Sequence, residues 1–254
     1  LEKNEGGRYI LGQFNDVEAL ISTYNQKLYN SSKQQLRKMI VKYDHLFIEH
    51  YKEDTVSIIN TIKNLTQNGI NNYTNMVNYW MQTTNPVLCN EKQTALLNMF
   101  SLSKVALIYG SASTGKTFLI NHISNLFSNK SRLYLAQTNP AVNNLRRKVT
   151  ASSNCTFMTI SKFISKRYTG KTTFDILIID ECSTVNNHDM KEVLNRANFE
   201  LLILVGDTYQ IESIEFGNWF DSVRFFLPNS SVCELTKPYR SDSKELLNVW
   251  TDVR

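Results

Sequence analysis

The stretch VALIYGSASTGKT, residues 105–117, joins a short apolar run to a loop of glycine and small polar residues. The loop matches the pattern GxxxxGK[ST] in full. Glycines let such a loop curl until its backbone N–H groups point at phosphate oxygens, while the lysine adds a mobile positive charge. The apolar run predicts a buried strand, and residues 118–127 predict a helix whose N-terminus faces the same anion. The candidate nucleotide ligands are Gly110, Ser111, Ala112, Ser113, Thr114, Gly115, Lys116 and Thr117.

Short apolar runs elsewhere predict the rest of the fold. After Pro86 such runs alternate with segments that mix polar and apolar residues at helical spacing. Buried strands alternating with helices imply βαβ units and a parallel sheet covered on both faces, an α/β fold. Such sheets bind ligands at the carboxyl ends of their strands, so the polar residues after each run are the candidates for function. The predicted strands are Val105–Tyr109, Leu133–Ala136, Phe157–Ile160, Ile176–Ile179, Leu201–Val205 and Val232–Leu235.

A pair of carboxylates follows one of these runs. The segment FDILIIDE, residues 174–181, is a predicted buried strand that ends in Asp180 and Glu181. Asp180 is a candidate Mg²⁺ ligand together with the Thr117 hydroxyl, and Glu181 is the candidate base that polarises an attacking water. A strand ending in acids is a weak signal alone and a strong one downstream of a phosphate loop. The two motifs together predict a site that binds a nucleotide with Mg²⁺ and hydrolyses it.

Three further side chains are candidates for the same site. Gln210 follows the run 201–205 and a Gly-Asp turn, where its amide could sense the γ-phosphate or orient water. Arg240 follows the last predicted strand and could neutralise phosphate charge. Gln93, near the start of a predicted helix, could bind the edge of adenine through its amide. Each also has a plain interpretation as part of a capped turn or loop, and the residues alone leave both open.

The stretch between Glu91 and Asp175 contains no Asp or Glu and many Lys and Arg. It is either a solvated face without function or a surface that attracts nucleotides or a nucleic-acid backbone. Hydroxyl and amide side chains follow two predicted strands within it, where they suit hydrogen bonds to sugar and phosphate. The candidate nucleic-acid ligands are Thr138, Asn139, Asn143, Thr159 and Ser161. Further along, Phe216, Trp219 and Phe220 could stack on bases or pack in the core.

Taken together and in this order, the motifs from Gln93 to Arg240 resemble the first RecA-like motor domain of superfamily 1 helicases, especially the RecD-like branch. The resemblance implies a RecA-like P-loop NTPase fold with ATP and Mg²⁺ as ligands. It also implies ATP hydrolysis coupled to translocation on single-stranded nucleic acid, with DNA favoured over RNA, and a second RecA-like domain in the parent chain. The isolated first domain is then expected to be a monomer that binds ATP with little turnover.

Two other functions remain open on the sequence alone. One is a P-loop ATPase that acts as a regulatory switch without nucleic acid. The other is a module that docks a partner or a nucleic acid without catalysis. A GTPase is disfavoured because the sequence lacks an Asn/Thr-Lys-x-Asp element that would read guanine.

The first 85 residues differ from the rest in the spacing of their apolar residues. Apolar side chains from Ser32 to Asn68 form one stripe at helical spacing, which predicts one long helix or two. Residues 73–80 predict another short helix. We therefore expect two parts, a helical N-terminal region at 1–85 and an ATP-binding domain at 86–254.

The composition excludes several classes of protein. Hydrophobic residues make up 42% of the 254-residue chain, which is enough for a core and excludes wholesale disorder. No apolar stretch approaches the roughly 18 residues of a membrane span, so we expect no membrane partner. The four cysteines lie far apart without metal-ligand spacing, which predicts buried free thiols in a reducing cytoplasm and no zinc site. Because the chain begins without methionine, we expect it to be a piece of a longer protein.

Overall fold

The computed structural model describes residues 16–29, 32–42, 45–150, 153–207, 217 and 219–236. The backbone forms two compact units, Leu1–Ser57 and Ile58–Arg254. Helix α3 (Glu49–Asn64) runs from the first unit into the second, and α4 (Tyr73–Thr84) belongs wholly to the second. The helices after Ser57 are therefore part of the same compact unit as the sheet described below.

The first unit combines helices with a β-hairpin. It contains α1 (Val17–Gln26) and α2 (Ser32–Gln35), followed by the antiparallel strands β1 (Met39–Lys42) and β2 (His45–Ile48). The Asn25 side chain holds the hairpin to α1, because its amide donates to the Met39 carbonyl and accepts from the Met39 N–H, both at 2.9 Å.

The hairpin corrects the predicted helical stripe from Ser32 to Asn68. Residues 39–48 are strands, and the long helix α3 begins only at Glu49. The sequence MIVK of β1 carries two β-branched residues in succession, which fit a pleated surface better than a helix. The N-terminal region is thus not wholly helical. The short helix predicted over residues 73–80 is confirmed as part of α4.

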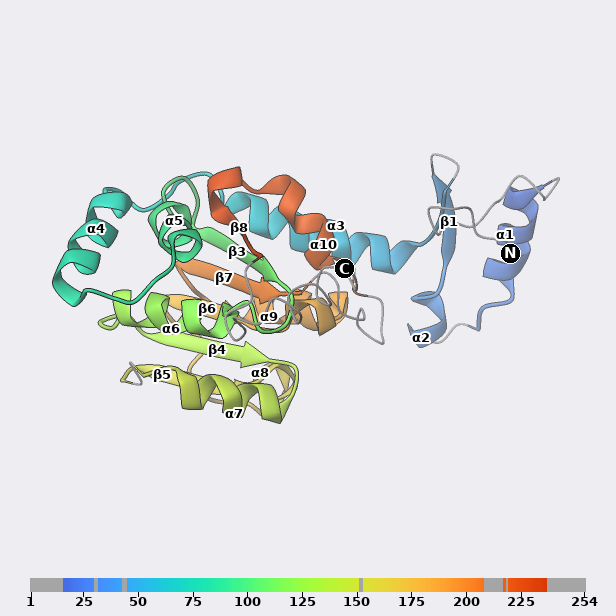
Figure 1. Ribbon diagram of the computed structural model, residues 1–254. Coiled ribbons are helices and arrows are strands. Elements are labelled where there is room, and N and C mark those ends of the chain that lie inside the picture. Colours follow the sequence, from blue (N-terminus) through green and yellow to red (C-terminus); the bar gives the residue numbers. More distant parts are fainter. Residues whose placement is uncertain are drawn as a thin grey trace, which may run out of the picture. The chain divides into compact units, whose positions relative to one another are not determined.

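The second unit is built on a parallel sheet (Figure 1), so the predicted fold class is confirmed. Among the described residues the strand order is β5-β4-β6-β7-β3-β8, and every pair in it is parallel. Each of the predicted apolar runs contributes one strand. The strands are β3 (Val105–Gly110), β4 (Arg132–Ala136), β5 (Cys155–Thr159), β6 (Ile176–Ile179), β7 (Leu201–Gly206) and β8 (Val232–Leu235).

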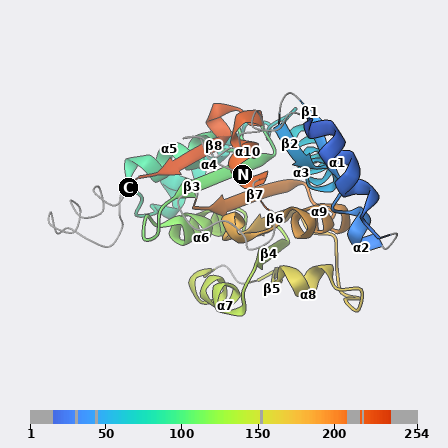
Figure 2. The same cartoon turned by 90° about the vertical axis from the view of Figure 1, so that its right-hand side faces the viewer.

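Helices cover both faces of this sheet, as Figure 2 shows nearly along its plane. In β3, Leu107 faces a core that includes Ile58 of α3, whereas Ile108 faces the opposite core with Leu119. The Leu119 face carries α4, α5 (Asn90–Asn98), α6 (Lys116–Leu126) and α7 (Asn139–Lys148). The other face carries α3, α8 (Ile160–Ile164), α9 (Asn187–Arg196) and α10 (Trp219–Val223). Short 3-10 turns occupy Cys182–Thr184, Arg224–Phe226 and Asn229–Ser231.

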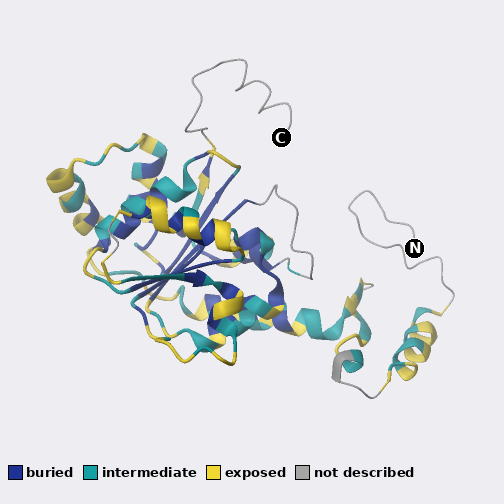
Figure 3. Cartoon of the chain, turned by 90° about the horizontal axis from the view of Figure 1, so that it is seen from below, coloured by how far each residue is buried: buried dark blue, intermediate teal, exposed yellow. Residues whose placement is uncertain are grey.

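The strands are the most buried part of the second unit, coloured dark blue in Figure 3. Every residue of β3, β4, β6 and β7 is buried. Trp219 and Phe220, candidates for base stacking, are fully buried against the same core, and the Trp219 indole donates to the Val185 carbonyl at 2.8 Å. Packing is therefore the role of both side chains. Phe216 lies outside the described residues.

Two further expectations can be set beside the structure. All four cysteines are free, but only Cys182 is buried, while Cys155 and Cys233 are half-buried and Cys89 is exposed. The expectation of buried thiols is therefore correct only for Cys182 and wrong for the other three, of which Cys89 precedes α5 at the protein surface. Within the described ranges, no helix combines the length and the apolar character needed to cross a lipid bilayer.

Candidate nucleotide-binding site

The loop between β3 and α6 has the curled backbone that the glycine pattern predicts. Gly115 has a φ of 89° and Ser113 a φ of 66°, both in the left-handed region. Gly110 has no room for a side chain, because a Cβ there would lie 2.6 Å from the Thr114 hydroxyl and 2.8 Å from the Leu235 carbonyl oxygen. The Thr114 hydroxyl in turn donates to the Ser111 carbonyl at 2.9 Å, which closes the loop on itself. The loop is therefore a backbone cradle at the N-terminus of α6.

Lys116 is the electrostatic centre of this loop. Its ammonium donates to the Ser111 carbonyl at 2.9 Å and to the Gly110 carbonyl. Burial lowers the pKa of this lysine, while the carboxylates of Asp207, Asp180 and Glu181 raise it. One ammonium thus interacts with three acidic side chains from two different strand ends.

The two acids predicted after β6 occupy different environments. Asp180 is buried, with 7% of its surface exposed, and its backbone N–H donates to the Leu135 carbonyl of β4 at 2.9 Å. Burial raises the pKa of Asp180 to about 6, and the neighbouring Glu181 carboxylate adds to that rise, whereas the Glu181 N–H, Lys116 and Lys148 lower it.

Glu181 is half-buried with a left-handed backbone at φ 57°. Burial raises the pKa of its carboxyl group, and Lys116 lowers it. A non-glycine residue held in this region of backbone conformation is strained, and such strain concentrates at functional sites. The turn directs two adjacent carboxylates to different positions at the end of one strand.

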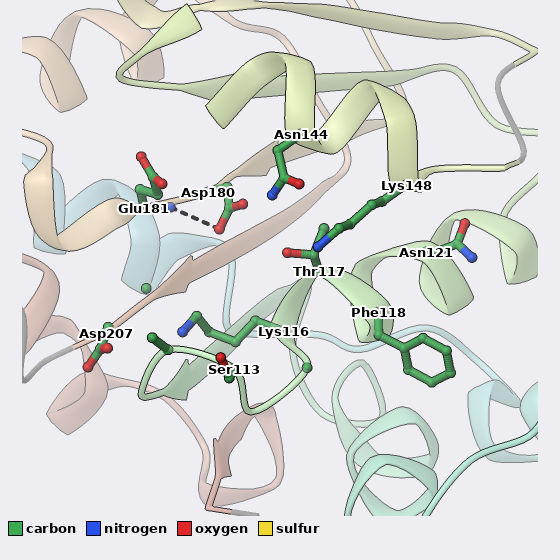
Figure 4. Close-up of a pocket in the computed structure, with 13 residues that line it drawn as sticks. Ser113, Lys116, Thr117, Phe118, Asn121, Asn144, Lys148, Asp180, Glu181 and Asp207 are labelled. Carbon is green, nitrogen blue, oxygen red and sulfur yellow. Dashed lines mark hydrogen bonds between the residues drawn. The ribbon is translucent and has the colours of Figure 1, made fainter. Parts of the chain in front are cut away.

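These groups line a single cavity of about 470 Å³ (Figure 4). Lys116 and Asp180 both line this cavity. Had they opened onto different surfaces, they could not bind one nucleotide and its metal. The lining residues are Ala112, Ser113, Gly115, Lys116, Thr117, Phe118, Asn121, Asn144, Lys148, Asp180, Glu181, Gly206 and Asp207. The structure therefore brings the phosphate loop and the two acids together at the carboxyl edge of the sheet, as the sequence predicts.

The cavity also contains residues that were not predicted to line it. Asp207 follows β7 directly, and this position at a strand end could have identified it as a site residue from the sequence. Asn144 and Lys148 enter from α7, four residues apart on one helix face. Phe118 and Asn121 come from the first turns of α6. The helix residues could not be found from sequence, because nothing in it fixes which helix face meets the loop.

Four predicted ligands of the nucleotide are not among the residues that line the cavity, namely Gly110, Ser111, Thr114 and Gln93. Gln93 lies in the first turns of α5 and is half-buried. Its role at adenine stays a prediction. Gln210 and Arg240 lie outside the described residues.

The candidate nucleic-acid ligands gather at the ends of two neighbouring strands. The parallel register pairs Ala136 of β4 with Thr159 of β5. Thr138 and Thr159 each cap the following helix, since their hydroxyls accept from the N–H groups of Ala141 and Lys162 at 3.3 Å. Both hydroxyls thus serve as helix caps. Asn139, Asn143 and Ser161 are exposed beside them, so the group forms one polar surface at the carboxyl edge.

The donor groups of the cavity fit a nucleoside triphosphate with Mg²⁺. The loop offers backbone N–H groups at a helix N-terminus, where a phosphate is favoured. Thr117 and Asp180 offer a hydroxyl and a carboxylate oxygen, the hard ligands that Mg²⁺ prefers. No cluster of three or more His, Cys, Asp or Glu side chains suited to a metal occurs in the described part of the chain. A metal here would thus share its coordination with phosphate and water.

A family match covers the residues that form this site. A family model described as an AAA domain matches residues 88–254. The chain belongs to this family. The match covers the stretch in which the motifs resemble the first RecA-like motor domain of superfamily 1 helicases, and it is consistent with that resemblance. No curated protein matches the chain.

Several solved structures are similar to this chain. Bacteroides Pif1 bound to ssDNA is 17% identical, with a TM-score of 0.43 over 66% of this chain and 46% of that one. Bacteroides Pif1 in complex with ADP-AlF3 and ssDNA is 18% identical, with a TM-score of 0.45 over 66% and 46%. Pif1 helicase from Candida albicans is 21% identical, with a TM-score of 0.42 over 66% and 44%. The chain thus spans just under half the length of these structures.

Proposed function

We propose that residues 86–254 form the ATP-binding motor domain of a superfamily 1 helicase. In the parent protein this domain hydrolyses ATP and couples hydrolysis to translocation on single-stranded nucleic acid, with DNA favoured over RNA. One observation carries the proposal, namely that Lys116, Thr117, Asp180 and Glu181 line the same cavity. Membership of the AAA domain family supports it over the same residues.

Each side chain of the cavity has a defined task in this proposal. The backbone N–H groups of residues 111–117 hold the phosphates, and Lys116 leaves its carbonyl partners to neutralise their charge. Thr117 and Asp180 would hold Mg²⁺, and a bound Mg²⁺ would supply polarisation of the terminal phosphate. Glu181 accepts a proton from the attacking water, a task that its raised pKa favours. Gln210 and Arg240 are proposed to complete the site by orienting water and neutralising the γ-phosphate.

The polar surface at the ends of β4 and β5 is the proposed track for nucleic acid. Thr138, Asn139 and Ser161 would contact sugar and phosphate, with Asn143 and Thr159 beside them. A second RecA-like domain of the parent protein would supply the other half of both the nucleotide cleft and the track. The isolated domain should accordingly bind ATP as a monomer in the cytoplasm with little turnover.

Nucleotide binding and nucleic-acid binding are tested separately. Calorimetry should show that the 254-residue chain binds Mg·ATP, and absence of binding would contradict the proposal. Anisotropy of a labelled thymidine oligonucleotide should show binding that weakens steeply with salt, because phosphate contacts release counterions.

Two variants test whether the oligonucleotide binds at the proposed track. Asn139→Ala and Ser161→Ala should weaken oligonucleotide binding without affecting ATP affinity, whereas Asn98→Ala, at an exposed position of α5, should change neither. ATP binding without any oligonucleotide binding would favour the regulatory ATPase instead.

A further inference from the structure

Helix α7 contributes one wall of the nucleotide cavity. Asn144 and Lys148 are four residues apart, so they lie on the same helix face, and both line the cavity. In Figure 4 the Lys148 side chain extends from α7 toward Thr117, on the side of the cavity opposite the phosphate loop. Its charge acts on Asp180, whose pKa it lowers. The α7 lysine is thus close enough to influence the group proposed to hold the metal.

Acidic side chains outnumber lysines in the lining of the cavity. Asp180, Glu181 and Asp207 all line it, and Lys116 interacts with all three. A bound triphosphate adds more negative charge to the same space, beside the charge that Mg²⁺ and Arg240 are proposed to offset. Lys148 supplies a second positive charge on the opposite wall.

The neighbouring basic residues of α7 point elsewhere. Arg146 is exposed, donates to the Phe157 carbonyl and lies 5.8 Å from the centroid of the Phe157 ring. Arg147, exposed like Lys148 itself, is not among the residues that line the cavity. The cavity thus selects one of three consecutive basic residues, and Arg147 is a matched control on the same turn.

The helix that carries Lys148 is firmly anchored. Ala141, Val142 and Leu145 are buried in the core, and the Val149 N–H donates to the Leu145 carbonyl at the helix end. A lysine in the last turn is also favoured by the helix dipole, which places partial negative charge there. The backbone that presents the ammonium to the cavity is therefore fixed by packing.

We propose that Lys148 is a second phosphate ligand that recognises the terminal phosphate of the bound triphosphate. This rests on the proposed nucleotide function. The ammonium extends toward Thr117, which is proposed with Asp180 to hold the metal beside the last phosphates. Lys148 therefore distinguishes a triphosphate from a diphosphate. Since α7 begins at Asn139 with Thr138 as its N-cap, the same helix connects the proposed nucleic-acid track with Lys148.

Calorimetry with two probes tests this role in the 254-residue chain. The probes are Mg·ADP and the Mg complex of a non-hydrolysable ATP analogue with an imido bridge. Lys148→Ala should raise the Kd of the triphosphate analogue about tenfold and change that of ADP by less than about twofold, as expected for loss of one charge-assisted contact. Lys148→Arg should recover most of the lost affinity, and Arg147→Ala should leave both values unchanged. Thermal unfolding of each variant reports whether it folds.

The outcomes separate this proposal from the function on which it rests. If Lys148→Ala binds both probes as the Arg147→Ala control does, Lys148 is not a phosphate ligand. An equal loss for the two probes would also overturn recognition of the terminal phosphate. If Lys116→Ala loses binding while Lys148→Ala does not, only the role of Lys148 fails. If the unmodified chain binds neither probe, both the nucleotide site and the Lys148 proposal are wrong.

Discussion

The backbone N–H of Glu181 donates a hydrogen bond of 2.9 Å to Oδ1 of Asp180. This contact joins the two acids of the site through the left-handed turn at Glu181. It holds one carboxylate buried at the strand end and leaves the next one half-buried in the same cavity. Two adjacent residues of one chemical type are thereby given different tasks by the backbone.

The catalytic role of Glu181 predicts a separation of binding from turnover. Glu181→Gln should keep Mg·ATP affinity within about threefold while lowering ATP hydrolysis by the parent protein by about a hundredfold or more, because the amide does not accept a proton. Phosphate release measures the rate and calorimetry the affinity. Glu200→Gln, an exposed position before β7, is the control that should retain activity. Undiminished hydrolysis by Glu181→Gln would assign the base to another residue.

Lys116 should be required for affinity. Lys116→Ala should raise the Kd for Mg·ATP by about a hundredfold, since it removes the positive charge at the centre of the phosphate loop. Lys130→Ala removes a lysine that lies 3.9 Å from half-buried Asp175 and is not among the residues that line the cavity, so this variant should bind as the unmodified chain does. A Kd for Lys116→Ala equal to that of the Lys130→Ala control would contradict the role given to this side chain.

Gly110 should tolerate no side chain. Gly110→Ala would place a methyl group against the Leu235 carbonyl and the Thr114 hydroxyl, and should lower the free energy of unfolding by about 2 kcal/mol. At Gly170 the added carbon meets the far end of the Tyr168 side chain, which can rotate, so Gly170→Ala should cost clearly less. Urea unfolding compares the two variants. Equal losses would mean that the loop backbone shifts freely.

Glu91 should fasten α5 to the end of β8. Its Oε1 accepts from the Thr236 N–H at 2.8 Å and from the Thr236 hydroxyl at 3.0 Å. A double-mutant cycle with Glu91→Ala and Thr236→Val should give a coupling free energy of about 1 kcal/mol in urea unfolding. Purely additive losses would show that the hydroxyl contact contributes no stability.

The sheet could be predicted because its strands are short apolar runs bounded by polar residues. β6 and β7 read as ILII and LLILVG, which a parallel sheet covered on both faces requires. The hairpin β1–β2 could not be predicted from the sequence, because Ile40 and Phe47 also fit a helical stripe. Over so few residues, the two periodicities give the same apolar positions, and cross-strand pairing decided the outcome.

The candidate site could be predicted where the chemistry is local in sequence. The phosphate loop and the acid pair each lie within one short segment, and the rule for strand ends brings them together. Lys148 and Asn144 depend on how α7 is rotated against α6, which the packing of Val142 and Leu145 fixes. Gln93 shows the reverse case, since its motif is local but the cavity lining does not include it.

The central claim is that Asp180 and the phosphate loop hold one metal–nucleotide complex. The most direct measurement is the Kd for ATP with Mg²⁺ and with excess chelator, in the unmodified chain and in Asp180→Asn. Asp221→Asn, at an exposed acid of α10, is the control. Mg²⁺ should tighten ATP binding by the unmodified chain and by the control, and should have no effect on Asp180→Asn. An Asp180→Asn variant that keeps the full Mg²⁺ effect would contradict a shared site.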